Sequence, residues 1–133
     1  MLLEHDGKSC LLGADAHPDV LKESIRKLIG KKRKLRVDAV KLPHHGSRRN
    51  VSDDLSRLID CRDFLVSTSG NRFHHPDAEA MARVILGGRS RVLHFNYRSQ
   101  ETEPWNDQKL MKKHGYEVRY PDEGAEGLVV SLA

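Results

Sequence analysis

The sequence predicts an α/β fold, with a mixed β-sheet and flanking helices. Short apolar runs bounded by Gly, Pro and Asp alternate with segments of helical periodicity after an opening hairpin, and this alternation is typical of α/β layering. The chain has 133 residues, the length of one modest domain. Hydrophobic residues make up 38% of it and aromatic residues only 5%. We therefore expect a thin, aliphatic core.

The N-terminal elements are a hairpin and a helix. Residues 1–13 contain two apolar runs around Asp6-Gly7, a dipeptide that favours tight hairpin turns. Residues 18–29 predict a helix that Gly30 ends. Its expected buried stripe consists of Val20, Leu21, Ile25, Leu28 and Ile29.

Two strands and two helices are predicted for the middle of the chain. Residues 35–42 form an apolar run without clean alternation, which favours a strand covered on both faces. A helix is expected over residues 52–60 with Ser52 as its N-cap, and a strand over residues 63–68. Residues 74–77 open a third helix, whose buried stripe is Ala80, Met81, Val84 and Ile85.

The C-terminal part predicts one more layer of the same kind. Residues 91–95 form a strand, and residues 96–103 form a polar loop. A last helix begins at residues 102–104. Residues 116–120 and 127–132 are expected to be paired strands, because the segment between them is rich in turn residues.

Polar stretches that can hold a site follow three of the predicted strands. Asp15 is an isolated carboxylate after an apolar run, His44-His45 is followed by a glycine, and His74-His75 repeats this plan. Imidazole and carboxylate groups at strand ends are a ligand set that suits zinc, manganese or iron. These groups are too far apart in sequence for a zinc finger, so they can converge only in a folded sheet.

Each of these residues also has an ordinary structural explanation. Asp15 can be a turn or helix-cap carboxylate. His75 can be the N-cap of the third helix. The pair His44 and His45 can be surface imidazoles without a ligand.

Three motifs, LLGADA (residues 11–16), VKLPHHGS (40–47) and STSGNRFHHPDAEA (67–80), occur in this order. Together they resemble the C-terminal half of a metallo-β-lactamase-fold hydrolase, in the branch that includes the metal-dependent domain of competence DNA-uptake proteins. The resemblance covers nearly the whole chain, and HHGS is its most specific part. It implies that residues 1–133 are a single domain, one half of an αβ/βα sandwich. The family's primary metal motif, His-x-His-x-Asp-His, lies in the N-terminal half and does not occur in this sequence.

The resemblance also implies roles for particular residues. Asp15 matches a carboxylate that bridges two metal ions, and His45 matches a ligand of one of them. His44 is then a supporting or substrate-contacting neighbour, although the sequence alone does not decide between His44 and His45. His75 matches a residue at the mouth of the site, so it is the candidate catalytic group that contacts the scissile group or moves a proton. The implied cofactor is zinc or manganese, with two ions in the complete fold.

The residues after the paired histidines favour an anionic substrate. Ser47, Arg48 and Asn50 are candidates to contact the substrate or to support the ligands. The chain carries 23 Lys and Arg against 19 Asp and Glu, a net charge of +4, and cations at the rim of a site attract phosphodiesters. The basic run Lys31–Lys34 reads as a solvated helix end and loop.

These observations predict the C-terminal part of a metal-dependent hydrolase that acts on phosphodiesters, of the nuclease or phosphodiesterase type. A catalytic zinc usually has three protein ligands, so Asp15 and His45 alone imply little or no activity. The missing N-terminal half would come from a longer chain, a partner subunit or a second copy. Two alternatives are a degenerate binding or regulatory module and a non-catalytic nucleic-acid-binding domain.

The remaining features concern partners and localisation. Cys10 and Cys61 form no CxxC motif, and the sequence shows no secretory signal, so we expect reduced cysteines in a cytoplasmic protein. No segment approaches the roughly 20 apolar residues of a membrane span. A sheet face left open by the missing half would promote homo-oligomers, and nucleic acid is the other expected partner.

Overall fold

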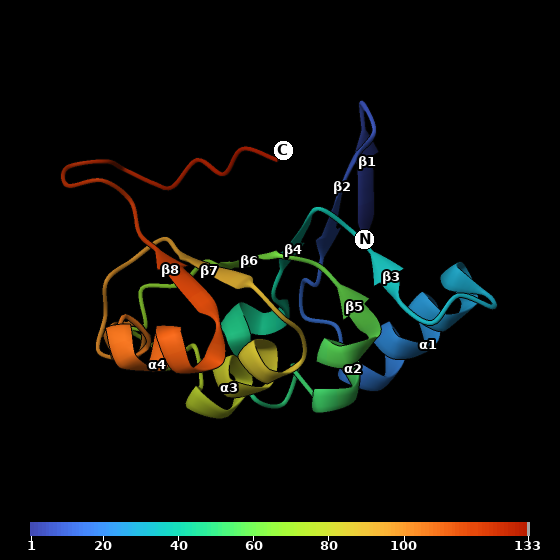
Figure 1. The fold of residues 1–133 in the computed structure, drawn as a ribbon, viewed down its shortest axis with the longest axis horizontal. Helices are drawn as coiled ribbons and strands as arrows, with labels where there is room; N and C mark the ends of the chain where they lie inside the picture. The colour runs from blue at the N-terminus through green and yellow to red at the C-terminus, as the bar shows by residue number, and fades with distance from the viewer. Residues whose placement is uncertain (133) are drawn as a thin grey trace.

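The computed structural model describes residues 1–132. A six-stranded sheet carries the fold, in the order β1-β2-β4-β6-β7-β8 (Figure 1). The first pair of strands is antiparallel and all the others are parallel, so the predicted mixed sheet is confirmed. The strands are β1 (Leu2–His5), β2 (Lys8–Leu12), β4 (Ala39–Lys41), β6 (Asp63–Val66), β7 (Arg91–Phe95) and β8 (Tyr116–Arg119).

Four α-helices pack against one face of this sheet (Figure 1). They are α1 (Pro18–Ile29), α2 (Asp53–Leu58), α3 (Ala78–Leu86) and α4 (Gln108–His114). The core lies between the sheet and these helices, where side chains such as Phe64 and Leu93 meet Met81 and Val84, all nearly inaccessible to solvent. Burial of each such side chain stabilises the fold by about 1.5–3 kcal/mol.

The predicted strand over residues 35–42 is wrong in one respect, because it is two strands in two sheets. Leu35–Arg36 forms β3, which pairs in parallel with β5 (Ile59–Asp60), whereas β4 joins the main sheet. The break falls at Asp38. Its carboxylate accepts hydrogen bonds from the backbone N–H and the hydroxyl of Ser9, and these bonds direct the chain from β5 to the side of β2.

Several predicted helix boundaries also need correction. The second helix ends at Leu58, since residues 59–60 form β5. The N-cap of α3 is Asp77 and not His75. The last helix begins after Asp107, whose side chain accepts from the Leu110 N–H, and residues 103–105 form a separate 3₁₀ turn. In α1 the predicted stripe holds for Leu21, Ile25 and Ile29, whereas Val20 and Leu28 are exposed.

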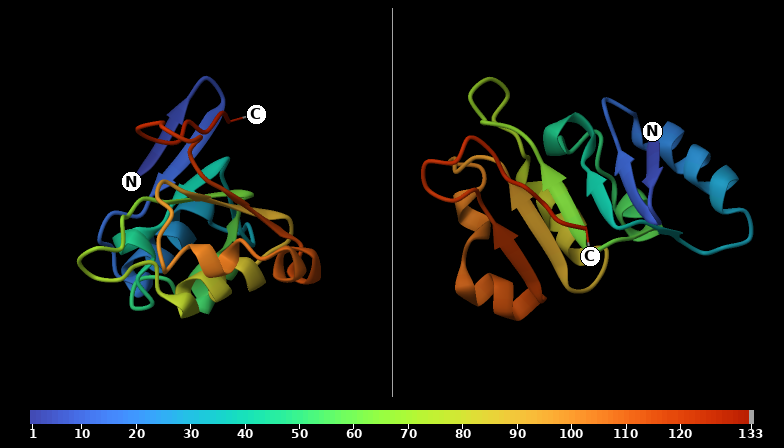
Figure 2. Two further views of the ribbon diagram at one scale, coloured as in Figure 1. Left: turned by 90° about the vertical axis from the view of Figure 1, so that its left-hand side faces the viewer. Right: turned by 90° about the horizontal axis from the view of Figure 1, so that it is seen from above.

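The predicted strand over residues 127–132 is wrong. No residue of this segment is in a strand. After β8 the chain turns back across the sheet face that carries no helix (Figures 1 and 2), where Leu128 and Val130 line a groove with Leu65 and His94. A pairing beside β8 is therefore replaced by a non-regular tail over the sheet.

The face under this tail is partly polar. The strand register places Lys41 on β4, Leu65 on β6 and His94 on β7 in one row across it. The Nε2 atom of His94 lies 2.7 Å from the Asp63 carboxylate. No helix among residues 1–132 is both long enough and apolar enough to cross a membrane.

Candidate functional site

The candidate site is built from three loops at one edge of the sheet. They follow β2, β4 and β6, which are adjacent and parallel. The carboxyl ends of adjacent parallel strands meet at one edge, which is where open α/β sheets bind ligands. Asp15 comes from the first loop, His44 and His45 from the second, and His75 from the third. The three loops therefore lie side by side at one edge of the sheet.

Backbone hydrogen bonds join the three loops directly. The N–H of His44 donates to the carbonyl of Ala14 at 2.7 Å, and the N–H of Asp77 donates to the carbonyl of Gly46 at 3.0 Å. Gly46 is required at its position, because its φ is +84° and an added Cβ would lie 2.8 Å from the Cβ of Pro76. The middle loop is thus held against both neighbours.

The backbone of this edge is strained. Six non-glycine residues of the described chain have positive φ, and four of them are in the three loops: Ala14, His44, His45 and His74. Non-glycine residues in this region each cost about 1–3 kcal/mol, and they concentrate at functional sites. Because His44 and His45 are consecutive, both imidazoles project from one short turn. The centroids of the two rings are 6.3 Å apart.

His45 has a defined tautomer. Its Nδ1 atom lies 2.5 Å from the carbonyl oxygen of Ser67. A carbonyl oxygen only accepts hydrogen bonds, so Nδ1 carries the proton and the Nε2 atom of the neutral ring keeps its lone pair. Histidine ligands of metals are commonly fixed in this way, through a bond from the other ring nitrogen to a carbonyl. His45 is also exposed, so its Nε2 atom is accessible.

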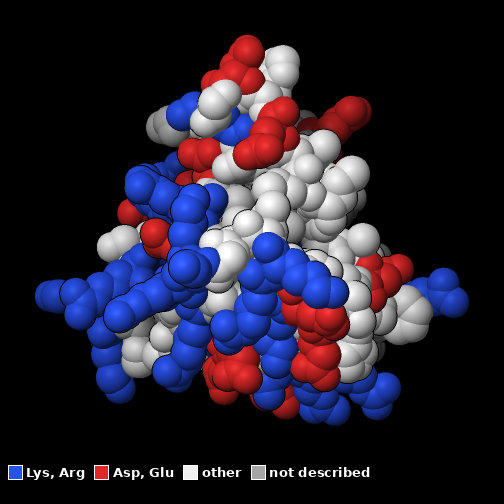
Figure 3. Space-filling model, turned by 90° about the vertical axis from the view of Figure 1, so that its right-hand side faces the viewer, with Lys and Arg blue, Asp and Glu red and all other residues white. Residues whose placement is uncertain are grey.

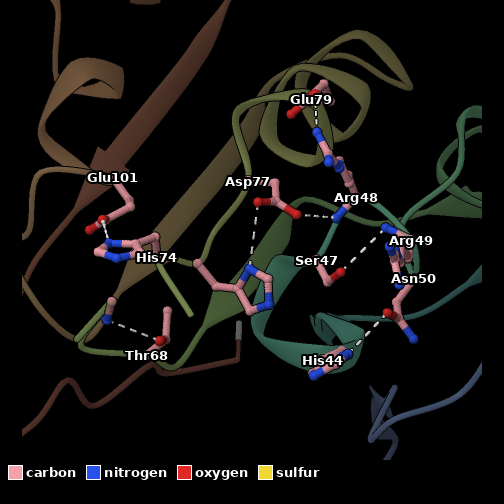
Figure 4. A network of polar contacts seen from close by, with 12 residues as sticks. His44, Ser47, Arg48, Arg49, Asn50, Thr68, His74, Asp77, Glu79 and Glu101 are labelled. Atoms are coloured by element: carbon pink, nitrogen blue, oxygen red, sulfur yellow. Dashed lines mark hydrogen bonds and ion pairs between the residues drawn. The ribbon is translucent and has the colours of Figure 1, made fainter. Parts of the chain in front are cut away.

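His44 has the same tautomer for a different reason. The Nδ2 atom of Asn50 lies 3.1 Å from the carbonyl oxygen of Ala16 and 3.4 Å from that of Asp15, so this atom must be the amide NH₂ group. The Oδ1 atom of Asn50 then lies 3.1 Å from His44 Nδ1 and accepts a hydrogen bond from its N–H group (Figure 4). Both adjacent histidines therefore keep Nε2 free to accept a proton or to bind a cation.

His75 lies next to these two rings. Its ring centroid is 5.4 Å from that of His44, in an edge-to-face arrangement. Its Nδ1 atom is buried without a hydrogen-bond partner, since the nearest carboxylate oxygen, on Asp77, is 3.6 Å away. This distance still allows an ion pair when the imidazole is protonated. Asp77 itself is fixed, because its other oxygen accepts the backbone N–H of Arg48 at 2.7 Å.

Asp15 is exposed in the turn after β2. Asn50 binds its backbone carbonyl and leaves its carboxylate free of that contact. The carboxylate is close enough to Lys41 to influence it electrostatically: burial lowers the pKa of the Lys41 ammonium, and the charge of Asp15 acts in the opposite direction.

The three candidate substrate residues differ in exposure. Ser47 and Asn50 are buried, and both carry internal hydrogen bonds, so they support the loop. Arg48 is exposed, and its guanidinium donates to Glu79 at 3.1 Å (Figure 4). Arg49 is exposed as well. A substrate contact in this group is therefore expected from the arginine side chains.

The residues present do not complete a catalytic metal site. Within residues 1–132, no group of three or more His, Cys, Asp or Glu side chains is arranged to hold a metal ion. The donor types of Asp15 and His45 suit zinc or manganese, but a catalytic zinc usually takes three protein ligands. Their role as ligands thus requires further donors from outside this set.

Sequence reasoning missed two residues that shape the site. One is Lys41, and the sequence signal that could have identified it is a charged residue inside an otherwise apolar strand. Asp77 was assigned only to the start of a helix, whereas it also holds the His45 loop through Arg48. The carbonyl of Ser67, which fixes the His45 tautomer, left no signal in the sequence.

Comparisons of this chain with protein-family models, with curated proteins and with solved structures give no match. The resemblance to metallo-β-lactamase-fold hydrolases therefore rests on the three motifs alone.

Proposed function

We propose that this chain is the C-terminal part of a metal-dependent phosphodiester hydrolase, and that it contributes some of the metal ligands and the substrate-facing loops. The observation that carries the proposal is the pair His44 and His45, each held by a neighbouring oxygen in the tautomer that leaves Nε2 free. In this proposal His45 and Asp15 bind the metal, His44 supports them, and His75 exchanges a proton with the substrate.

The charges around the histidines support an anionic substrate. Arg48 and Arg49 are exposed beside the paired histidines, and Arg48 is only partly neutralised by an exposed glutamate. Cations at the rim of a polar site raise the local concentration of anions such as phosphodiesters. Zinc or manganese, when bound by a complete ligand set, would supply Lewis-acid activation of a phosphoryl oxygen.

The same structure also favours a second candidate, a binding module without catalysis. The specific observation is that the described residues bring together no three-ligand cluster. The loops would then still bind an anion through their arginines. The two candidates differ in one property, which is whether the histidines bind a metal ion.

Isothermal titration with zinc distinguishes them. The proposal predicts weak zinc binding by the parent chain, which is lost in both Asp15→Ala and His45→Ala. The control is His114→Ala at the exposed end of α4, which should bind zinc as the parent does. Circular dichroism of each variant checks that the fold is retained. Binding that persists in both site variants, or no binding by the parent, would rule out the hydrolase proposal and leave the binding module.

A further inference from the structure

A second polar groove lies at the other end of the strands, away from the histidine loops. It has a volume of about 520 Å³ and is formed by the end of α2, strand β5, and the turn between α3 and β7. Because β6 and β7 are parallel, this amino-terminal edge is opposite to the edge that carries the histidines. Its lining includes four cations and one carboxylate, on Lys34, Arg57, Arg89, Arg91 and Asp60.

Arg91 places a buried positive charge beneath this groove. Its side chain is 2% exposed. The guanidinium donates to the hydroxyl and the carbonyl of Ser56 and to the carbonyls of Val84 and Ile59. All of these acceptors are neutral, and no carboxylate of residues 1–132 lies within 4.0 Å of the guanidinium, the limit for an ion pair. The carboxylate of Asp60 acts on this charge from beyond ion-pair distance, so the buried guanidinium is only partly neutralised and its field reaches the groove.

The turn above Arg91 is built to lie close to the guanidinium. A Cβ on Gly88 would be 2.7 Å from the Arg91 Nε atom, and a Cβ on Gly87 would be 2.2 Å from the Ser56 hydroxyl. The Nε atom has no hydrogen-bond partner. Arg91 itself contributes to the lining of the groove, and at Gly87 and Gly88 no side chain covers its guanidinium.

The rim of the groove adds exposed cations to the buried charge of Arg91. Lys34, Arg57 and Arg89 are exposed, and none of them has a carboxylate partner within ion-pair distance among the described residues. The basic surface continues from the groove along the segment before and within β3, through Lys31, Lys32, Arg33 and Arg36. Figure 3 shows Lys and Arg side chains gathered on the side of the molecule that carries α1 and β3.

From this combination we propose that the groove binds the phosphodiester backbone of a nucleic acid, with one phosphate held over Gly88 and further phosphates along the basic segment. A series of exposed cations that lack ion-pair partners suits a polyanion such as a polynucleotide better than a single small anion. The proposal does not depend on metal binding or hydrolysis at the histidine loops.

Fluorescence anisotropy of a labelled single-stranded oligonucleotide tests the proposal, in a chelator and over a range of salt concentrations. The double variant Arg57→Ala/Arg89→Ala should weaken binding by about tenfold, and it should reduce the slope of log affinity against log salt by about 1.4, the loss of two phosphate contacts. The matched control is Lys109→Ala/Lys112→Ala on α4, which removes the same charge from exposed positions. This control should change the affinity less than twofold.

Three further results decide the matter. The loss caused by Arg57→Ala/Arg89→Ala should be the same with zinc present and with chelator present, which separates this groove from the metal site proposed above. Equal losses in the groove variant and in the α4 control would overturn the proposal, because binding would then follow net charge alone. The proposal also fails if vesicles of phosphatidylserine and phosphatidylcholine, or inorganic phosphate alone, show the dependence on Arg57 and Arg89 while the oligonucleotide does not.

Discussion

The Oδ1 atom of Asn50 accepts a hydrogen bond from the Nδ1–H group of His44 at 3.1 Å. The same amide group donates to the carbonyl of Ala16 in the loop after β2. One buried side chain therefore ties the loop after β2 in place and fixes the tautomer of a histidine in the loop after β4. This makes Asn50 a positioning residue, which acts on the site through His44.

Replacement of Asn50 by Ala should destabilise the fold by about 1–3 kcal/mol, because buried polar groups lose their partners. Urea unfolding measures this change. Asn71→Ala is the matched control, since Asn71 is exposed and its side chain makes no hydrogen bond in the described structure. Equal stability of the two variants would show that the Asn50 bonds contribute nothing.

Gly46→Ala should destabilise the loop junction more than Gly7→Ala. Both glycines have positive φ, which costs an alanine about 1–2 kcal/mol. An alanine at position 46 would in addition meet Pro76, whereas nothing lies within 4 Å at position 7, so overpacking adds about 1–3 kcal/mol. Thermal unfolding of the two variants isolates the contact between the loops, and identical losses would argue against it.

The sequence was sufficient where local signals decide the structure. The helix at residues 18–29 has the predicted bounds, and the Ser52 side chain caps α2 as expected. The alternation of strands and helices correctly predicted the mixed sheet with flanking helices.

Prediction from the sequence was wrong where contacts between residues far apart in the chain determine the structure. The break at Asp38 depends on Ser9, 29 residues away, and no local pattern announces it. The tail over residues 127–132 has a strand-like sequence, yet it lies over the sheet face. In the site, the tautomer of His45 depends on Ser67, 22 residues away, and no local pattern indicates that contact.

The thiol of Cys61 should make stability depend on alkaline pH. Burial raises its pKa from 9.0 to about 12. Between these values the unfolded thiol is ionised and the folded thiol is protonated, so the folded state binds more protons and stability falls as the pH rises from 9. Urea unfolding across this range should show a steeper fall for the parent than for Cys61→Ala. If the stability of the parent and of Cys61→Ala fell equally with pH, the Cys61 thiol would not be the group responsible.

Arg91→Lys should be strongly destabilising although it keeps the charge. A lysine ammonium cannot reach all the acceptors that the planar guanidinium satisfies, so buried carbonyls of Ser56 and Ile59 lose their donor. We expect a loss on the order of 3 kcal/mol. Arg62→Lys is the control, because Arg62 is exposed and has only a 3.7 Å ion pair with Glu117. Similar stabilities of the two variants would mean that the guanidinium bonds have little value.

In the function proposed here, the paired histidines present free Nε2 atoms as part of a metal site. The most direct test follows the histidine Cε1–H resonances by NMR during a zinc titration, with assignments from single His variants. We expect that the His45 resonance responds first, that those of His44 and His75 respond with it, and that those of His5 and His114 do not. A response confined to His5 or His114, or none in the three loop histidines, would contradict the claim.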